Sequence, residues 1–275
     1  MILMAKIGLA LAGGGARGAY QIGAWKAFKE KGLDKLIVAY SGASVGSLNA
    51  ALFAMGDYDA AYKVWMSLDR DSLFNLEDKI YKRVFKEKLR FLDKGVYDTL
   101  DLEVLIEDAL DYDKIRKKDV FVATTHLGSE ESTFFSLLQT NYKHYFKSEK
   151  QTKYQNLKVL SDEHIKKTLL ASCAIPIVFR PIRIGDETFY DGGLLDNTPF
   201  KPLVDIGCDV IIIIDLFKHS FVKKQSAEGV KLITVNPKKS LRGILDFSNK
   251  YIERRFELGY KDTIDMIEKN MDILF

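Results

Sequence analysis

The chain has 275 residues, of which 47% are hydrophobic and 29% are charged, an ordinary composition for a globular protein. A formal net charge of +3 argues against a nucleic-acid-binding protein, and two cysteines, Cys173 and Cys208, are too few for a disulfide framework. Because no segment approaches the roughly 20 apolar residues of a membrane-spanning helix, and because the N-terminus lacks the basic leader of a signal peptide, we expect a cytoplasmic protein with free, buried thiols.

The first thirty residues predict a strand, a glycine-rich loop and a helix. The apolar run from Ile7 to Ala12 is typical of a buried strand. A helical pattern follows from Ala19 to about Lys31, and Gly32 is a suitable C-terminal stop. The loop between them reads Gly13-Gly14-Gly15-Ala16-Arg17-Gly18.

A serine follows the second predicted strand. Leu36 to Tyr40 is a short apolar run typical of a parallel strand, and Val45 to Ala54 predicts a helix that ends near Gly56. Ser44 therefore lies on a strand-to-helix turn, within Gly42-Ala43-Ser44-Val45-Gly46. Such a turn strains the backbone of the serine and exposes its hydroxyl, as a nucleophile requires. The alternative is a glycine-rich turn with an incidental serine.

The remaining segments continue the alternation of helices and strands. The helices are predicted over much of 57–112 and over 162–170, 202–207 and 248–269. The strands are predicted over 119–125, 132–138, 178–184, 209–216 and 230–235, with a further short segment ending at Tyr190-Asp191-Gly192-Gly193. Two of these strands, 119–125 and 132–138, are expected to pair as a hairpin, and the polar stretch 142–158 is expected to be a loop. The pattern predicts one α/β domain with a mainly parallel sheet.

The loop at Gly13 to Gly18 fits a dinucleotide fingerprint only in part. That fingerprint also needs an acidic residue at the end of the second strand, where this chain has Ala39-Tyr40-Ser41. A phosphate-binding P-loop would need Gly-Lys-Ser/Thr, and Gly18 is followed by Ala19. A nucleotide-binding regulatory module remains the rival from another functional class. A third use of the loop is to present backbone N–H groups to an oxyanion beside Ser44.

A nucleophilic serine needs a base, and two candidates differ in mechanism. Asp191 lies between a strand-like segment and two glycines, and a carboxylate within hydrogen-bond reach can accept the serine proton directly. In the order serine, acid, histidine of an ordinary α/β-hydrolase, only His219 follows Asp191. His219 lies among lysines, and no glycine-framed turn adjoins it. The alternative for this histidine is an ordinary surface or loop residue. The alternative for Asp191 is a purely structural role, since an aspartate is common in a turn before two glycines.

Taken together, these motifs resemble the patatin-like phospholipases. Gly13 to Gly18, with Arg17, is similar to the glycine-rich oxyanion loop of that family, Gly42 to Gly46 to its nucleophile elbow, and Asp191-Gly192-Gly193 to its Asp-Gly-Gly/Ala motif. The segments Ala171 to Pro176, Phe179 to Pro181 and Asn197 to Pro199 are also similar. The likeness spans roughly residues 5 to 215, and it is weak over 57–118.

The resemblance implies a three-layer α/β/α fold with a mainly parallel central sheet, in one domain over 1–275 with a mostly helical insertion at about 57–118 and a C-terminal helix at about 248–269. It implies a serine acyl hydrolase with a Ser44–Asp191 dyad, an acyl-enzyme and no metal or other cofactor. The implied substrates are phospholipids, lysophospholipids and related acyl glycerol esters. Whether Arg17 takes a direct part or only packs is left open.

One basic segment bears on access to a lipid substrate. Residues 79–94 carry seven lysines and arginines against Glu87 and Asp93, with Tyr81, Phe85, Leu89 and Leu92 at helical spacing. A basic amphipathic helix can lie on an anionic membrane surface, which would make the protein peripheral to a membrane. The alternative is an ordinary surface helix whose apolar side packs on the core.

Overall fold

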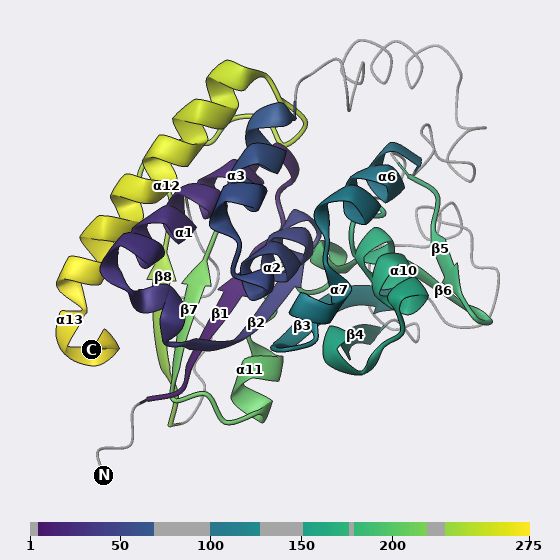
Figure 1. Ribbon diagram of the computed structural model, residues 1–275, viewed down its shortest axis with the longest axis horizontal. Helices are drawn as coiled ribbons and strands as arrows, with labels where there is room; N and C mark the ends of the chain where they lie inside the picture. Colours follow the sequence, from purple (N-terminus) through teal and green to yellow (C-terminus); the bar gives the residue numbers. More distant parts are fainter. Residues whose placement is uncertain (1–4, 69–99, 127–150, 176–178, 219–228) are drawn as a thin grey trace, which may run out of the picture.

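The computed structural model describes residues 5–68, 100–126, 151–175, 179–218 and 229–275 (Figure 1). Within these ranges eight strands form one mixed sheet in the order β5-β6-β3-β2-β1-β7-β8, with β4 paired to β3. The fold is thus α/β, as the sequence predicts. No helix in these ranges is long and apolar enough to cross a membrane. The strand predicted over 132–138 and the basic segment 79–94 lie outside the described residues.

Five strands form the parallel part of the sheet, because the pairs β1–β2, β2–β3, β1–β7 and β7–β8 are all parallel. These strands are β1 (Ile7–Leu11), β2 (Ile37–Ala43), β3 (Asp119–His126), β7 (Val210–Ile214) and β8 (Lys231–Val235). All five residues of β1 and of β7 are buried, as expected of strands covered on both faces.

Three antiparallel strands complete the sheet: β4 (Gln151–Asn156), β5 (Ile182–Ile184) and β6 (Glu187–Asp191). The prediction of a loop over 142–158 is therefore wrong for β4, which pairs with β3 along Phe121 to His126. β4 is only half-buried and lacks an apolar run, so its lysine and glutamines gave no signal for a strand. The strand predicted around Pro181 begins only at Ile182, after a residue that cannot donate to a ladder.

The helical layers on the two faces are unequal. The larger core lies on the face covered by α1 (Ala19–Lys31), α2 (Val45–Met55), α3 (Tyr58–Ser67), α6 (Leu100–Ala109), α10 (Asp162–Ser172) and α12 (Asn249–Lys269). The shorter α7 (Tyr112–Ile115) and α13 (Met271–Leu274) add to it. Within the described ranges, α11 (Lys201–Asp205) covers the other face, where Leu203 and Cys208 pack against Ile211 and Ile213.

The C-terminal helix α12 lies along α1, on the opposite side of the molecule from α6 and α10 (Figure 1). The backbones touch at Gly23 and Gly259: a Cβ on Gly23 would lie 1.9 Å from the Phe256 carbonyl oxygen, and one on Gly259 would lie 1.8 Å from that of Tyr20. The buried face of α12 includes Ile252 and Ile267, as the apolar spacing predicts. It also includes polar residues that the spacing does not predict, namely Arg255, Asp262 and Thr263.

Candidate active site

Ser44 occupies the strand-to-helix turn that the sequence predicts, between β2 and α2. Its φ of 52° lies in the left-handed region, which is unfavourable for a residue with a Cβ and is often found at functional sites. The two glycines of the motif permit the turn because a Cβ on Gly42 would lie 2.2 Å from the Gly46 carbonyl oxygen, and one on Gly46 the same distance from that of Leu11. Ser44 is 6% exposed.

Two other serines hold the backbone of Ser44. The Ser44 N–H donates to Oγ of Ser172 at 3.0 Å, and that hydroxyl donates in turn to the Ala123 carbonyl at 2.7 Å. The hydroxyl of Ser47 donates to the Ser44 carbonyl at 2.6 Å. Sequence reasoning assigned no role to Ser172 or Ser47, because a serine within a helix carries no signal for a contact made 128 positions away.

Asp191 reaches Ser44 because of the way β6 joins the sheet. Since β4 runs along one side of β3 over Phe121 to His126, β6 must pair with the other side, where β2 has ended opposite Ala123. Asp191 lies opposite Thr124, the next residue of β3. The last residue of β6 is therefore placed directly beyond the carboxyl end of β2, where Ser44 begins its turn.

The Asp191 carboxylate is 5% exposed and makes two polar contacts. It accepts the Gly193 N–H at 2.7 Å, and the Ser44 hydroxyl lies next to it. Burial raises the pKa of Asp191 to about 6, although the Ser44 hydroxyl and the Gly193 N–H both lower it. The carboxylate is thus ionised at neutral pH, with a basicity well above that of an exposed aspartate.

Gly13, Gly192 and Gly193 fit closely around this pair. A Cβ on Gly13 would lie 3.0 Å from the Ser44 Cβ, and one on Gly192 would lie 2.1 Å from the Ala123 carbonyl oxygen. Asn197 joins the two glycine segments. Its side-chain amide donates to the Gly13 carbonyl at 3.2 Å, and its backbone carbonyl accepts the Gly13 N–H at 3.1 Å. Its Oδ1 would lie 2.6 Å from a Cβ on Gly193.

The N–H groups of the glycine-rich loop divide into two sets. Those of Gly13, Ala16 and Arg17 donate to the carbonyls of Asn197, Ile244 and Gly14, at 3.1, 2.7 and 3.2 Å. Those of Gly14 and Gly15 have no acceptor in the part of the chain that the structure describes. Gly15, with a φ of 54°, lines the same pocket as Ser44. The two unpaired donors are thus positioned on the loop beside the serine.

Arg17 and Gly18 connect the loop to other parts of the structure. The guanidinium of Arg17 donates to the Arg242 carbonyl at 2.8 Å and lies over the ring of Phe217, 4.8 Å from its centroid. The Gly18 carbonyl accepts from the side chain of Asn49 at 3.1 Å. These contacts link the Arg17 side chain to residues 216–217 and to Arg242.

A pocket with an empty volume of about 1060 Å³, its open mouth included, extends from Ser44 and Gly15. It is lined by α2, α3, α6 and the segment that follows α10. Its walls are mainly aliphatic and aromatic: Val45, Leu48, Leu52, Val64, Trp65, Leu68, Leu102, Leu105, Ile106, Ala109, Leu110, Ile175, Phe179, Leu245 and Phe247. Asn49 is a buried polar residue on its wall, and its side chain binds Gln21 and Trp65 as well as Gly18. Such a lining suits a long apolar ligand.

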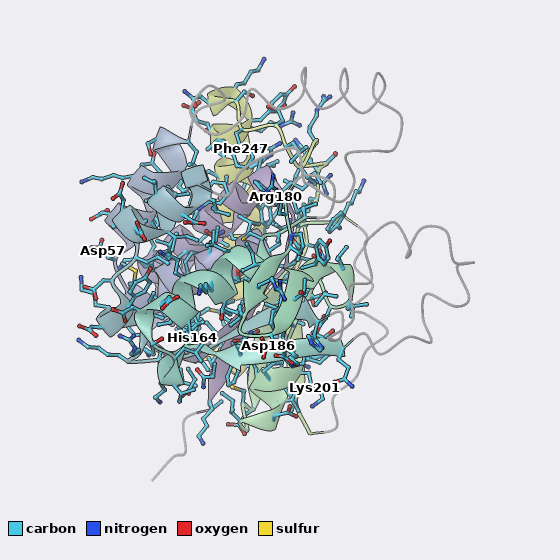
Figure 2. All side chains as sticks on the ribbon, turned by 90° about the vertical axis from the view of Figure 1, so that its right-hand side faces the viewer. Asp57, His164, Arg180, Asp186, Lys201 and Phe247 are labelled. Atoms are coloured by element: carbon cyan, nitrogen blue, oxygen red, sulfur yellow. The ribbon has the colours of Figure 1, made fainter. Side chains whose placement is uncertain are left out.

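The two histidines that the structure describes make their polar contacts with residues other than Ser44 and Asp191. His126 is within 3.3 Å of Glu187, and His164 contacts the hydroxyl of Ser161 on the surface of α10. Figure 2 shows His164 well separated from Phe247, one of the pocket residues. His144 and His219 lie outside the described residues. In the described ranges no cluster of three or more His, Cys, Asp or Glu side chains could hold a metal ion.

Several known proteins are similar to this chain. Uncharacterized NTE family proteins of Mycobacterium bovis and Mycobacterium tuberculosis are 24% identical over 211 residues, which cover 77% of this chain and 49% of each relative. The chain therefore spans about half the length of these curated relatives.

Solved structures show the same fold at low identity. Human GIVD cytosolic phospholipase A2 has a TM-score of 0.58 at 10% identity, covering 98% of this chain and 60% of that one. VipD from Legionella pneumophila has a TM-score of 0.54 at 16% identity, covering 96% of this chain and 67% of that one. ExoU of Pseudomonas aeruginosa, in complex with SpcU, has a TM-score of 0.51 at 18% identity, covering 97% of this chain and 53% of that one. The family described as patatin-like phospholipase matches residues 9–204. That match covers most of the chain, and the chain accordingly belongs to the patatin-like phospholipase family.

Proposed function

We propose that this protein is a serine acyl hydrolase that cleaves the carboxylic ester bonds of phospholipids, lysophospholipids or related acyl glycerols. The observation that carries the proposal is the buried Asp191 carboxylate next to the Ser44 hydroxyl, which lowers its pKa, at one end of an apolar pocket. Membership of the patatin-like phospholipase family supports the same reaction class.

In the first step the Ser44 Oγ attacks the ester carbonyl while Asp191 accepts its proton. With a pKa of about 6, Asp191 is ionised at pH 7 and still basic enough to share the proton in the transition state. Negative charge develops on the former carbonyl oxygen. The unpaired N–H groups of Gly14 and Gly15 and the N-terminus of α2 are the donors available to stabilise it.

Collapse of the tetrahedral intermediate releases the alcohol, which takes the proton from Asp191, and leaves an acyl group on Ser44. Water then attacks this acyl-enzyme with Asp191 as base, which releases the fatty acid and restores the serine. The aliphatic pocket would hold the acyl chain during both steps, since burying each CH₂ group contributes about 0.8 kcal/mol. Head-group preference and positional selectivity on glycerol do not follow from this pocket.

A fluorophosphonate probe with a long alkyl chain tests the proposal. We expect it to label Ser44, identified by mass spectrometry of the modified peptide, and to abolish hydrolysis of a chromogenic acyl ester. The matched control is Ser67→Ala, which removes an exposed hydroxyl bonded only to the Val64 carbonyl and should label as the wild type does. Labelling elsewhere, or none in a folded protein, contradicts the proposal.

A further inference from the structure

The buried guanidinium of Arg255 is the part of α12 that the proposed reaction leaves unexplained. Arg255 is 1% exposed, which makes it the largest fully buried side chain in the described ranges. Burying a charge is costly unless it is well hydrogen-bonded, so a fully buried arginine needs partners. Burial lowers the pKa of Arg255 to about 10.

Its partners are backbone carbonyls rather than carboxylates. Three of them belong to the segment that precedes α12, residues 241–246, which we call the strap: the carbonyls of Leu241, Gly243 and Asp246, with bonds of 2.8, 2.9 and 2.5 Å. The fourth is the Ala16 carbonyl of the glycine-rich loop, at 3.2 Å. One planar guanidinium thus binds the strap and the loop together, which its rigid fork of donors permits.

The strap and the loop also contact each other directly. The Ile244 carbonyl accepts the Ala16 N–H at 2.7 Å, and a Cβ on Gly15 would lie 2.2 Å from the same oxygen. Both polar groups of the Ala16 backbone are therefore bound, one by the strap and one by Arg255. This fixes the peptide units next to the unpaired N–H groups of Gly14 and Gly15.

We propose that Arg255 is a positioning residue for the reaction, because it orients the Gly14 and Gly15 N–H groups through its bonds to Ala16 and the strap. The inference rests on the proposed function and places part of the active-site machinery outside the family-matched residues 9–204. Arg255 acts through the loop and the strap, since it is 1% exposed and four of its five N–H donors bind carbonyls.

The test is Arg255→Lys, with Arg254→Lys on the exposed side of the same helix turn as the matched control. Lysine keeps the charge but offers a single ammonium, which cannot bind the loop and the strap with the same geometry. We expect kcat on a soluble acyl ester to fall about tenfold to a hundredfold with KM within about threefold, since small misplacements of catalytic groups cost that much. Arg254→Lys should leave both constants unchanged.

A comparison at equal stability separates positioning from simple packing. Ile267→Val weakens the buried face of α12 at its far end without touching the loop, and it should keep kcat within about twofold at a similar fall in melting temperature. Should Arg255→Lys fold poorly, Arg255→Gln, which keeps a planar amide but offers fewer donors, is the second variant and should lower kcat likewise. Hydrogen exchange at residues 13–18 should be faster in Arg255→Lys than in Ile267→Val.

Two results would overturn the inference: a folded Arg255→Lys protein with wild-type kcat, or an equal loss of kcat in Ile267→Val. A wild-type protein that neither hydrolyses esters nor reacts with the fluorophosphonate would instead overturn the proposed function, and the inference with it. The two failures are therefore distinguishable in one set of assays.

Discussion

Two segments flank the proposed reaction centre, the Ser44 turn and the Gly13–Gly18 loop, and they are held in place by different means. The turn depends mostly on close neighbours in the sequence, because Gly42 and Gly46 allow its backbone contacts and Ser47 binds its carbonyl. The loop depends on distant residues, because the Ala16 backbone is bound by Ile244 and by Arg255, the latter 239 positions away. A short motif can therefore specify the nucleophile, whereas the shape of the proposed oxyanion loop needs most of the folded chain.

The largest expected effect is on the local side of this comparison. Ser44→Ala should lower kcat at least about ten-thousandfold, because the substitution removes the hydroxyl that attacks the ester. Ser44→Gly should be as inactive as Ser44→Ala but more stable than that variant by roughly 1 kcal/mol, since glycine adopts a φ of 52° without strain. Ester turnover and urea denaturation measure the two effects. An active Ser44→Ala protein with native circular dichroism would end the proposal.

Removal of the base should have the next largest effect. Asp191→Asn is expected to lower kcat about a hundredfold to ten-thousandfold, because the amide is similar in size but cannot accept the serine proton. His219→Ala should have little effect under the same assay. If both variants are folded and equally inactive, the mechanism is a triad in which Asp191 orients a histidine.

The pKa of Asp191 predicts how activity depends on pH. With a pKa of about 6, the essential carboxylate is lost on acidification, so kcat/KM should fall about tenfold per unit below pH 6 and roughly a hundredfold by pH 4. Because the folded state holds this proton more tightly than the unfolded chain, the contribution of Asp191 to the free energy of unfolding is greatest below about pH 4. That contribution falls by about 3 kcal/mol in all as pH rises from well below 4 to well above 6, and about 2 kcal/mol of the fall lies between pH 4 and pH 6.

Urea denaturation at pH 4 and at pH 7 checks the sign of this pH effect. The unfolding free energy of Asp191→Asn, measured relative to the wild type, should be higher at pH 7 than at pH 4, because the amide carries no charge to bury. A pH–rate profile without an inflection between about pH 5 and 7 would show that the carboxylate is not the group that titrates in the reaction.

Ser172→Ala tests a long-range support of the Ser44 turn. The substitution leaves the buried Ser44 N–H without its acceptor, which should cost about 1–3 kcal/mol of stability and about tenfold in kcat. Ser240→Ala, which removes an exposed hydroxyl, is the control. A loss of kcat as large as that of Asp191→Asn would break the comparison, since the turn would then depend on distant residues as much as the loop does.

The smallest expected effect on ester turnover concerns the basic segment 79–94, whose role stays a prediction from the sequence. Charge reversal at Lys82, Arg83 and Lys86 should weaken binding to anionic vesicles by about 1 kcal/mol per residue, more at low salt than at high salt. Hydrolysis of a soluble ester should not change. Three reversals on α12, at Lys250, Lys261 and Lys269, are the control for net charge. If vesicle binding is unchanged after reversal at Lys82, Arg83 and Lys86, the basic residues of the segment are only solvated and do not bind a membrane.

Much of the fold follows from local patterns in the sequence. The parallel strands and the helices α1, α2, α10 and α12 lie within a few residues of their predicted bounds, because each carries an apolar run or stripe and a stop signal such as Gly32 or Gly56. β4 was not predicted, because a half-buried strand of polar residues takes its conformation from its partner, β3.

The candidate site shows the same limit. The sequence motifs identify Ser44, the loop and Asp191, and the structure brings all three together. What the motifs could not show is why they meet. That β6 continues the line of β2 along β3 is a matter of topology, and the roles of Ser172, Asn197 and Arg255 arise from contacts across the chain.

The contact of α1 with α12 through Gly23 and Gly259 limits how far the chain can be shortened. The family-matched residues end at 204, before β7, which pairs with β1, and before α12, which packs on α1. A recombinant fragment that stopped there would leave one edge of β1 unpaired and the apolar surface of α1 open to water, which favours edge-to-edge aggregation. Limited proteolysis between β8 and α12 should for the same reason end in precipitation rather than in a smaller soluble enzyme.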